Sequence, residues 1–325
     1  MNGKKSGEIP RKENFRKLSK LIDRGNVPQA ILIQGPAGSG KGSLAEYFGM
    51  ALLCEKEAGP CHRCRSCELA GGGNHPSFFA LSPEKGEIRV SQVRSIHPEL
   101  ARKTFFGKRR VILIHGSDRM NKSAANSLLK ILEEPPPGSH FILTASQAGR
   151  VLPTIRSRCF SFHIPPPTEE ERTLFFSKLR EKEPGRPQEQ ALSASEGNMD
   201  LLREIASGSV PGPGEIMEAL RGKNYRKIAD IASLFKDDAL FPHALIILKR
   251  LLLDLLLLSM GEKSCIMNRE ILEQGRGKRA TLRPQKLVEL SHKLSALEYL
   301  PRQADRAFIS EAILLFLSEM EARER

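Results

Sequence analysis

The sequence predicts an α/β fold, in which a parallel sheet with a phosphate-binding loop (P-loop) is followed by a helical second half. Three observations lead to this prediction. The apolar run 31–33 leads into a glycine-rich stretch ending on Lys41, an order typical of a strand, a P-loop and a helix start. Two further apolar runs, 111–114 and 141–145, suit buried parallel strands. Beyond residue 209 the apolar spacing is helical throughout.

The glycine-rich stretch has the spacing Gly-x-x-x-x-Gly-Lys, and its candidate phosphate-binding residues are Gly35, Gly38, Gly40 and Lys41. Backbone N–H groups of such a loop surround phosphate oxygens, while the lysine and the next helix N-terminus supply positive charge. The following position normally holds a Ser or Thr that ligates Mg²⁺, but here it is Gly42, and Ser43 comes one residue late. A chance glycine-rich turn is the alternative. The flanking strand and helix favour a P-loop with a damaged metal site.

The second metal-binding position of a P-loop ATPase is also altered. The run 111–114 is typical of the core strand whose end presents Asp for Mg²⁺ and often Glu for the attacking water. Those two places hold His115 and Gly116. Asp118 is a nearby carboxylate, which we interpret as a cap of the following helix or as the partner of a basic neighbour. Two independent changes therefore predict a site that has lost its catalytic metal.

Four of the six cysteines form a cluster with the spacing of a metal site, and they are Cys54, Cys61, Cys64 and Cys67. Four thiolates match a closed tetrahedral zinc site, with no position left for a reactive water. The sequence therefore predicts structural zinc in a small module, residues 54–74, and the alternative is a set of free thiols. His62 lies between the ligands and is expected to be an exposed bystander.

The remaining first half shows a regular alternation of helices and strands. Apolar spacing predicts helices at 14–24, 43–53, 88–100 and 121–134, and a short strand at 78–82. After the run 141–145 comes a loop with two arginines, Arg156 and Arg158. An arginine on such a loop can reach a neighbouring subunit and stabilise charge during phosphoryl transfer, and a surface salt bridge is the alternative.

Composition limits the class of protein. The net charge of +13 favours contact with a polyanion, of which nucleic acid is the leading candidate, although charge alone is weak support. The apolar stretch 244–260 contains three charged residues and is expected to be a buried helix rather than a membrane span. Residues 1–20 lack the apolar segment of a signal peptide, and clustered cysteines without an export signal suggest metal rather than disulfides. We therefore expect a cytoplasmic protein with no membrane contact.

Proline and glycine clusters divide the chain into three predicted domains. The first, 1–165, is the nucleotide-binding-like domain with the inserted cysteine module. A proline run separates it from a small helical domain, 166–208, which begins with a predicted N-cap at Thr168. The stretch 208–214, rich in glycine and proline, opens the last domain, 209–325, which we expect to be all-α.

The order of motifs resembles that of bacterial clamp-loader ATPases of the AAA+ class, which work within the DNA polymerase III holoenzyme. The resemblance rests on the P-loop, the four-cysteine module, the segment 124–136 (AANSLLKILEEPP) and Ser157-Arg-Cys159. It implies that Arg158 is an arginine finger offered in trans to a neighbouring ATPase subunit, and that the four cysteines bind structural zinc. It also implies a small helical lid at 166–208 and an oligomerisation collar at 209–325.

The resemblance further implies partners: gamma and tau ATPase subunits, a delta subunit and, indirectly, the sliding clamp and primed DNA. Gamma and tau resemble working ATPases, with Thr after the loop lysine and Asp-Glu at the second strand end. This chain has Gly42, His115 and Gly116 instead, and Asp200 stands where the family places a second sensor arginine. We therefore expect weak or absent ATP binding and no intrinsic hydrolysis.

Two other functions remain open at this point. The first is an active, gamma- or tau-like ATPase subunit in the same fold. The second is a zinc-dependent enzyme or a DNA-binding zinc module unrelated to the ATPase fold, although four cysteine ligands leave no open coordination site for catalysis.

Overall fold

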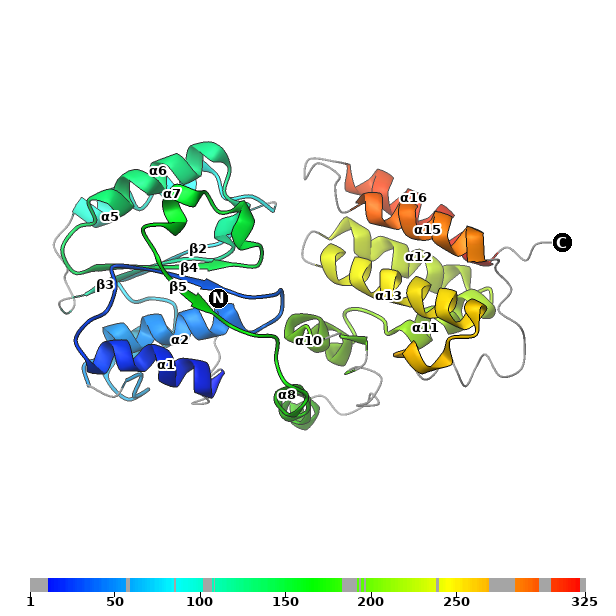
Figure 1. Ribbon diagram of the computed structural model, residues 1–325, viewed down its shortest axis with the longest axis horizontal. Coiled ribbons are helices and arrows are strands. Elements are labelled where there is room, and N and C mark those ends of the chain that lie inside the picture. Colours follow the sequence, from blue (N-terminus) through cyan, green and yellow to red (C-terminus); the bar gives the residue numbers. More distant parts are fainter. Residues whose placement is uncertain are drawn as a thin grey trace. The chain divides into compact units, whose positions relative to one another are not determined.

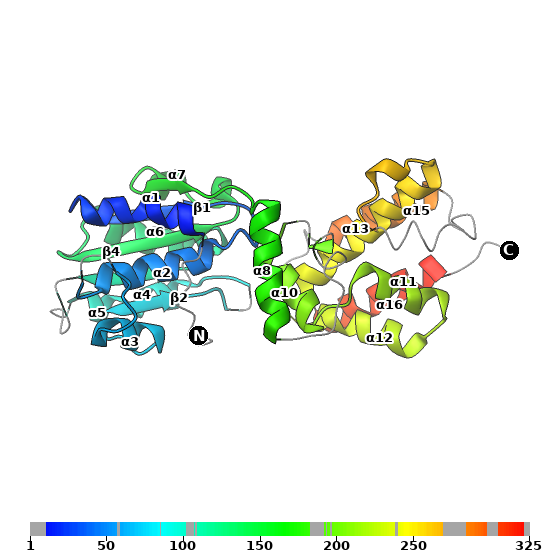
Figure 2. The same ribbon diagram turned by 90° about the horizontal axis from the view of Figure 1, so that it is seen from below.

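The computed structural model describes residues 11–56, 59–84, 86–101, 107, 109–182, 192, 194–195, 197–237, 240–268, 284–297 and 305–321. The chain divides into two compact units, Met1–Pro166 and Pro167–Arg325 (Figures 1 and 2). In the second unit, the described residues of the two predicted helical domains share one hydrophobic cluster. The division at residue 208 therefore stays a prediction.

The first unit is built on a five-stranded parallel sheet with the order β2-β3-β4-β1-β5. The strands are β1 (Ala30–Gln34), β2 (Phe78–Leu81), β3 (Arg110–Ile114), β4 (Ser139–Ala145) and β5 (Phe160–His163). The three central strands read as continuous apolar runs because helices bury both of their faces. The predicted parallel sheet is confirmed, and β5 is an addition to the predicted strands.

Helices cover both faces of this sheet (Figure 1). One face packs against α1 (Lys12–Asp23) and α2 (Lys41–Leu53), where Leu44 and Phe48 are fully buried. The other packs against α4 (Val90–Arg94), α5 (His97–Ala101), α6 (Lys122–Glu133) and α7 (Pro153–Arg156). Successive strand residues point to opposite faces, so that the central strands β1, β3 and β4 each contribute to both hydrophobic clusters.

The prediction of a single helix over 88–100 is wrong, because the segment forms two short helices, α4 and α5. Pro98 has no backbone N–H to donate to the carbonyl group four residues earlier, so a continuous helix would lose a hydrogen bond there. The hydroxyl of Ser95 also donates to the Gln92 carbonyl, 2.8 Å away, and competes with the helical pattern. A further helix that the sequence did not indicate, α3 (Arg65–Gly71), lies within the cysteine module.

The described part of the second unit is helical. Its α-helices are α8 (Glu169–Lys182), α10 (Met199–Ser207), α11 (Pro213–Arg221), α12 (Tyr225–Ser233), α13 (Phe241–Met260), α15 (Pro284–Ala296) and α16 (Arg306–Glu321). Short 3-10 helices occur in both units: η1 (Ser117–Arg119), η2 (Ala148–Arg150), η3 (Leu234–Lys236) and η4 (Lys263–Cys265). The predicted N-cap of α8 is confirmed, because the Glu171 N–H donates to the Thr168 hydroxyl and the Glu171 carboxylate accepts from the Thr168 N–H.

The long apolar helix α13 is buried along one side, as the charges within its sequence suggested. Asp254 is fully buried and pairs with Arg250 at 2.8 Å. The same carboxylate accepts the backbone N–H groups of Met267 and Asn268, so the segment after the helix folds back onto it. Across the described residues, no helix combines the length and the apolar character needed to cross a membrane.

Candidate functional site

The P-loop joins β1 to α2, and its glycines are required by close contacts and by backbone angles. The Gly35 N–H donates to the Ala145 carbonyl oxygen at 3.2 Å, which closes the loop against β4. A Cβ atom on Gly35 would lie only 2.5 Å from the Ile164 carbonyl oxygen. Gly38 and Gly40 have φ values of 68° and 79°, in the left-handed region that glycine tolerates best. The loop therefore has the close contacts and left-handed backbone angles that require glycine at these positions.

Two basic side chains lie on this loop. Lys41 opens α2 and its Nζ donates to the Pro36 carbonyl oxygen at 3.0 Å. Arg11 was not indicated by the sequence, because it lies far away along the chain. Its Cγ would be 3.4 Å from a Cβ atom on Gly40, and its guanidinium donates to the Pro165 carbonyl oxygen at 2.8 Å. Both cations are placed where they would attract an anion at the helix N-terminus.

The side of the loop that holds Mg²⁺ in a working ATPase is lined by a different pair of side chains. The His115 Nε2 atom lies 3.3 Å from the Glu46 Oε1 atom. The His115 Nδ1 atom is 3.6 Å from the position of a Cβ on Gly42. Gly42 and Glu46 are four residues apart and share one face of α2. The imidazole therefore lies along the face from which a metal-binding hydroxyl at position 42 would project.

The segment after β3 is held by hydrogen bonds to the end of β4. The Gly116 N–H donates to the Thr144 hydroxyl oxygen at 3.0 Å. The Asp118 carboxylate accepts the Gln147 N–H at 3.1 Å. The interpretation of Asp118 as a helix cap is wrong, because the Asn121 side chain caps α6. A tertiary contact to the loop after the neighbouring strand β4 had no local signal in the sequence.

Arg158 lies on the turn before β5, at the amino end of the sheet. Its Nη2 atom pairs with Glu133 Oε1 at 2.9 Å, and its Nη1 donates to the Thr154 carbonyl oxygen at 3.1 Å. It borders a hollow of about 200 Å³ that is lined by Pro28, Gln29, Ala30, Leu132, Pro135, Phe141, Arg158 and Phe160. Because β5 pairs in parallel with β1, this end of the sheet is opposite to the P-loop. Arg158 and the P-loop of the same chain are therefore separated by the length of the strands.

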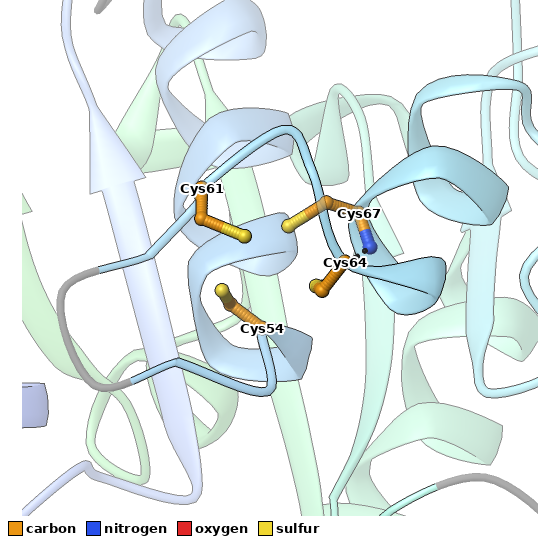
Figure 3. Close-up of side chains that lie close together, drawn as sticks. All are labelled: Cys54, Cys61, Cys64 and Cys67. Atoms are coloured by element: carbon orange, nitrogen blue, oxygen red, sulfur yellow. Dashed lines mark hydrogen bonds between the residues drawn. The ribbon is translucent and has the colours of Figure 1, made fainter.

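The four predicted ligand cysteines are brought together, and their Sγ atoms all lie within 4.8 Å of one another (Figure 3). Cys54 directly follows α2, while Cys64 caps α3 and Cys67 lies in its first turn. Four thiolates at ~2.3 Å from a tetrahedral zinc ion would be about 3.8 Å apart. The observed spacing is compatible with such a site. His62 is exposed, packs beside the ring of Tyr47 and is not part of the cluster.

The pKa values of the cluster's thiols are shifted in opposite directions at different cysteines. The backbone N–H of Arg63 is the main cause that lowers the pKa of Cys61 to about 6. Burial raises the pKa of Cys67 and of Cys54, because a thiolate loses its hydration there. A divalent cation among the sulfur atoms would offset this cost and favour the thiolate form.

The fold and the P-loop define the class of protein, and comparison with solved structures agrees. A gamma subunit-related protein of DNA polymerase III from Thermotoga maritima has the same fold, with a TM-score of 0.50 and 18% identity over 95% of this chain and 100% of that chain. Residues 11–168 match the family model described as DNA polymerase III, delta subunit. The first unit is therefore similar in sequence to the delta-subunit family of this polymerase, and the fold is shared with a gamma subunit-related protein.

Sequence relatives narrow the assignment further. The DNA polymerase III subunit delta′ of Pseudomonas aeruginosa is 39% identical over 55% of this chain and 56% of its own length. The delta′ subunit of Escherichia coli is 32% identical over 66% of this chain and 60% of its own length, and that of Bacillus subtilis is 33% identical over 46% of each chain. The aligned region thus spans about half the length of these curated relatives. The chain is a homologue of the bacterial DNA polymerase III delta′ subunits, in agreement with the resemblance of its motifs to the clamp-loader class.

We predict that Gly35→Ala destabilises the protein by about 1–3 kcal/mol, because the added methyl group meets the Ile164 carbonyl at 2.5 Å. Urea unfolding measures this loss. Gly149→Ala is the matched control, since a Cβ there has no neighbour within 4 Å. Equal stabilities of the two variants would contradict the role of Gly35 as an obligatory close contact.

Proposed function

We propose that this chain is the delta′ subunit of a bacterial clamp loader, which helps to place the sliding clamp on primed DNA in the cytoplasm. It assembles with gamma or tau ATPase subunits and a delta subunit, and it does not itself hydrolyse ATP. The observation that carries the proposal is the His115–Glu46 pair beside Gly42, in a loop that otherwise keeps its glycines and lysine. The homology to delta′ subunits supports the assignment to this assembly.

The loss of hydrolysis follows from electrostatics. Catalysis of phosphoryl transfer depends on cations that neutralise charge developing on the phosphate oxygens. Gly42 offers no hydroxyl ligand and His115 no carboxylate, so neither of the usual protein ligands for Mg²⁺ is present. Lys41 and Arg11 still favour an anion at the loop, but without the metal ligands ATP binding is weak or absent.

An active gamma- or tau-like ATPase is the second candidate, because a solved gamma subunit-related protein shares the fold. The changes at Gly42, His115 and Gly116 count against it, and so does Asp200, whose carboxylate would repel phosphate. Asp200 lies in the first turn of α10, with Arg203 at 3.9 Å. The substitutions fall on separate segments of the chain, which argues for a site that is no longer catalytic.

We further propose that Arg158 acts as an arginine finger on the ATP of an adjacent subunit. Its position at the amino end of the sheet makes a role at its own P-loop unsuitable. Both side chains of its ion pair with Glu133 are partly exposed to solvent. Such surface ion pairs contribute only about 0–1 kcal/mol to stability. The guanidinium can therefore leave Glu133 for a phosphate group at small cost.

Arg158→Ala tests this role in the reconstituted loader, made from this chain, the ATPase subunits and the delta subunit. We predict intact assembly, but a loss on the order of 1000-fold in hydrolysis at the one site that receives the arginine. The total DNA-dependent ATPase activity of the loader should fall by the fraction of hydrolysis that this one site contributes.

Arg156→Ala is the matched control, because Arg156 is an exposed arginine on the same turn. Its loader should hydrolyse ATP and load clamps as the wild type does. Normal hydrolysis and loading with Arg158→Ala would refute the finger, and a loss with Arg156→Ala alone would assign the role to Arg156.

The four-cysteine cluster is proposed to hold structural zinc. Its donors are all sulfur, two of them are buried, and the geometry leaves no protein ligand position open for water. Zinc there supplies no chemistry beyond crosslinking a module that has few apolar residues of its own. A zinc-dependent enzyme is therefore not favoured.

Metal analysis tests the zinc site. We predict one zinc ion per purified chain, its loss in Cys64→Ser, and a lower melting temperature for that variant, because the module loses its crosslink. Cys265→Ser is the control, since Cys265 is exposed and outside the cluster. A zinc content well below one per chain in the wild type would count against the site.

The second unit is proposed to contain the lid and the oligomerisation collar. Helix α16 supports the collar, because it packs Ile309 and Ile313 inward while Phe308 and Leu315 are 71% and 67% exposed. Phe308 and Leu315 are seven residues apart and lie on one face of the helix. Such an exposed apolar face is typical of a subunit interface.

A further inference from the structure

A buried series of hydrogen bonds, formed by Ser66 and His75, lies next to the cysteine cluster. Both side chains are almost completely buried, with exposures of 2% and 4%. The Ser66 hydroxyl donates to the Leu53 carbonyl oxygen at 2.6 Å and is 2.8 Å from His75 Nε2. The His75 Nδ1 atom accepts the Ser77 N–H at 3.0 Å. None of these residues is a metal ligand in the proposed site.

The directions of these hydrogen bonds follow from their donors. Because His75 Nδ1 accepts from a backbone N–H, it carries no proton, and the neutral ring has its proton on Nε2. Burial lowers the pKa of His75, which agrees with a neutral ring. The Nε2–H group therefore donates to the Ser66 oxygen, and Ser66 uses its own proton for Leu53. In this arrangement the Ser66 hydroxyl and both ring nitrogens of His75 all have hydrogen-bond partners.

The hydrogen bonds of Ser66 connect the two segments that carry the cysteines. Leu53 is the last residue of α2 and directly precedes Cys54, while Ser66 lies in α3 beside Cys67. A second link joins the same segments, because the Ser66 N–H donates to the Glu55 carboxylate at 3.2 Å. Cys54 and the pair on α3 are thus held together by bonds that do not involve a metal.

We propose that Ser66 and His75 are positioning residues that preorganise the metal site, so that Cys54, Cys64 and Cys67 are in place before the ion binds. Cys61 then closes the site as the ligand on the loop between the two segments. Preorganisation raises the affinity for the metal because the entropy of ordering the ligands is lost on folding and not on metal binding. This inference rests on the proposed zinc site.

The test is a competition titration of metal-free full chain with Zn²⁺ and a chelator of known affinity. We expect Ser66→Ala to bind zinc about 10–100-fold more weakly, the range typical of residues that orient metal ligands. His75→Phe should weaken binding in the same direction, since it removes the donor to Ser66. Ser66→Thr keeps the hydroxyl and should recover most of the affinity.

Ser95→Ala is the control, because it removes an exposed serine hydroxyl with one local hydrogen bond, in the turn between α4 and α5 and outside the module. Absorption of the Co²⁺ form gives a second readout: Ser66→Ala should keep the thiolate charge-transfer bands at saturation, since all four ligands remain. If Ser66→Ala does not fold, His75→Phe decides by the same criterion.

The outcomes separate the two proposals. Wild-type chain that binds neither Zn²⁺ nor Co²⁺ through thiolates overturns the metal site, and this inference with it. Wild-type binding with a Ser66→Ala affinity within about twofold of it overturns the positioning role alone. A loss in Ser66→Thr as large as that in Ser66→Ala would also overturn it, because the hydroxyl would then not be the cause.

Discussion

The close approach of Gly35 to the Ile164 carbonyl group is the constraint on which the two functional ends of the first unit depend. Ile164 follows β5 directly, and the turn that carries Arg158 precedes the same strand. Strand β5 therefore supports the P-loop at one end of the sheet and Arg158 at the other. A side chain on Gly35 would push these elements apart, so the loop remains glycine-rich for a packing reason that is independent of catalysis.

This separation between fold and chemistry explains the composition of the nucleotide site. The glycines of the loop satisfy backbone angles and close contacts, and they would be needed whether or not ATP binds. The metal ligands have no such structural role, and here a His–Glu pair lies beside Gly42 in their place. In the account proposed here, the chain keeps the P-loop as a scaffold and presents Arg158 to the site of a neighbour.

Much of the fold could be predicted from local patterns, since the central strands are continuous apolar runs and the P-loop has fixed spacing. The four cysteines were also predictable as a cluster, because short spacings limit how far apart their sulfur atoms can lie. Strand β5 was missed because it has four residues and most of them are exposed. Arg11, Glu46 and the Ser66–His75 series of hydrogen bonds were missed because each acts through a tertiary contact, which leaves no periodicity in the sequence.

Steady-state ATP hydrolysis by the purified chain alone, in the presence of Mg²⁺, measures directly whether this P-loop is catalytic. We expect a rate no higher than that of Lys41→Ala, because the usual protein ligands for the catalytic metal are replaced by Gly42 and His115. Appreciable turnover in the wild type that Lys41→Ala abolishes would contradict this expectation, since the chain would then be an ATPase in its own right.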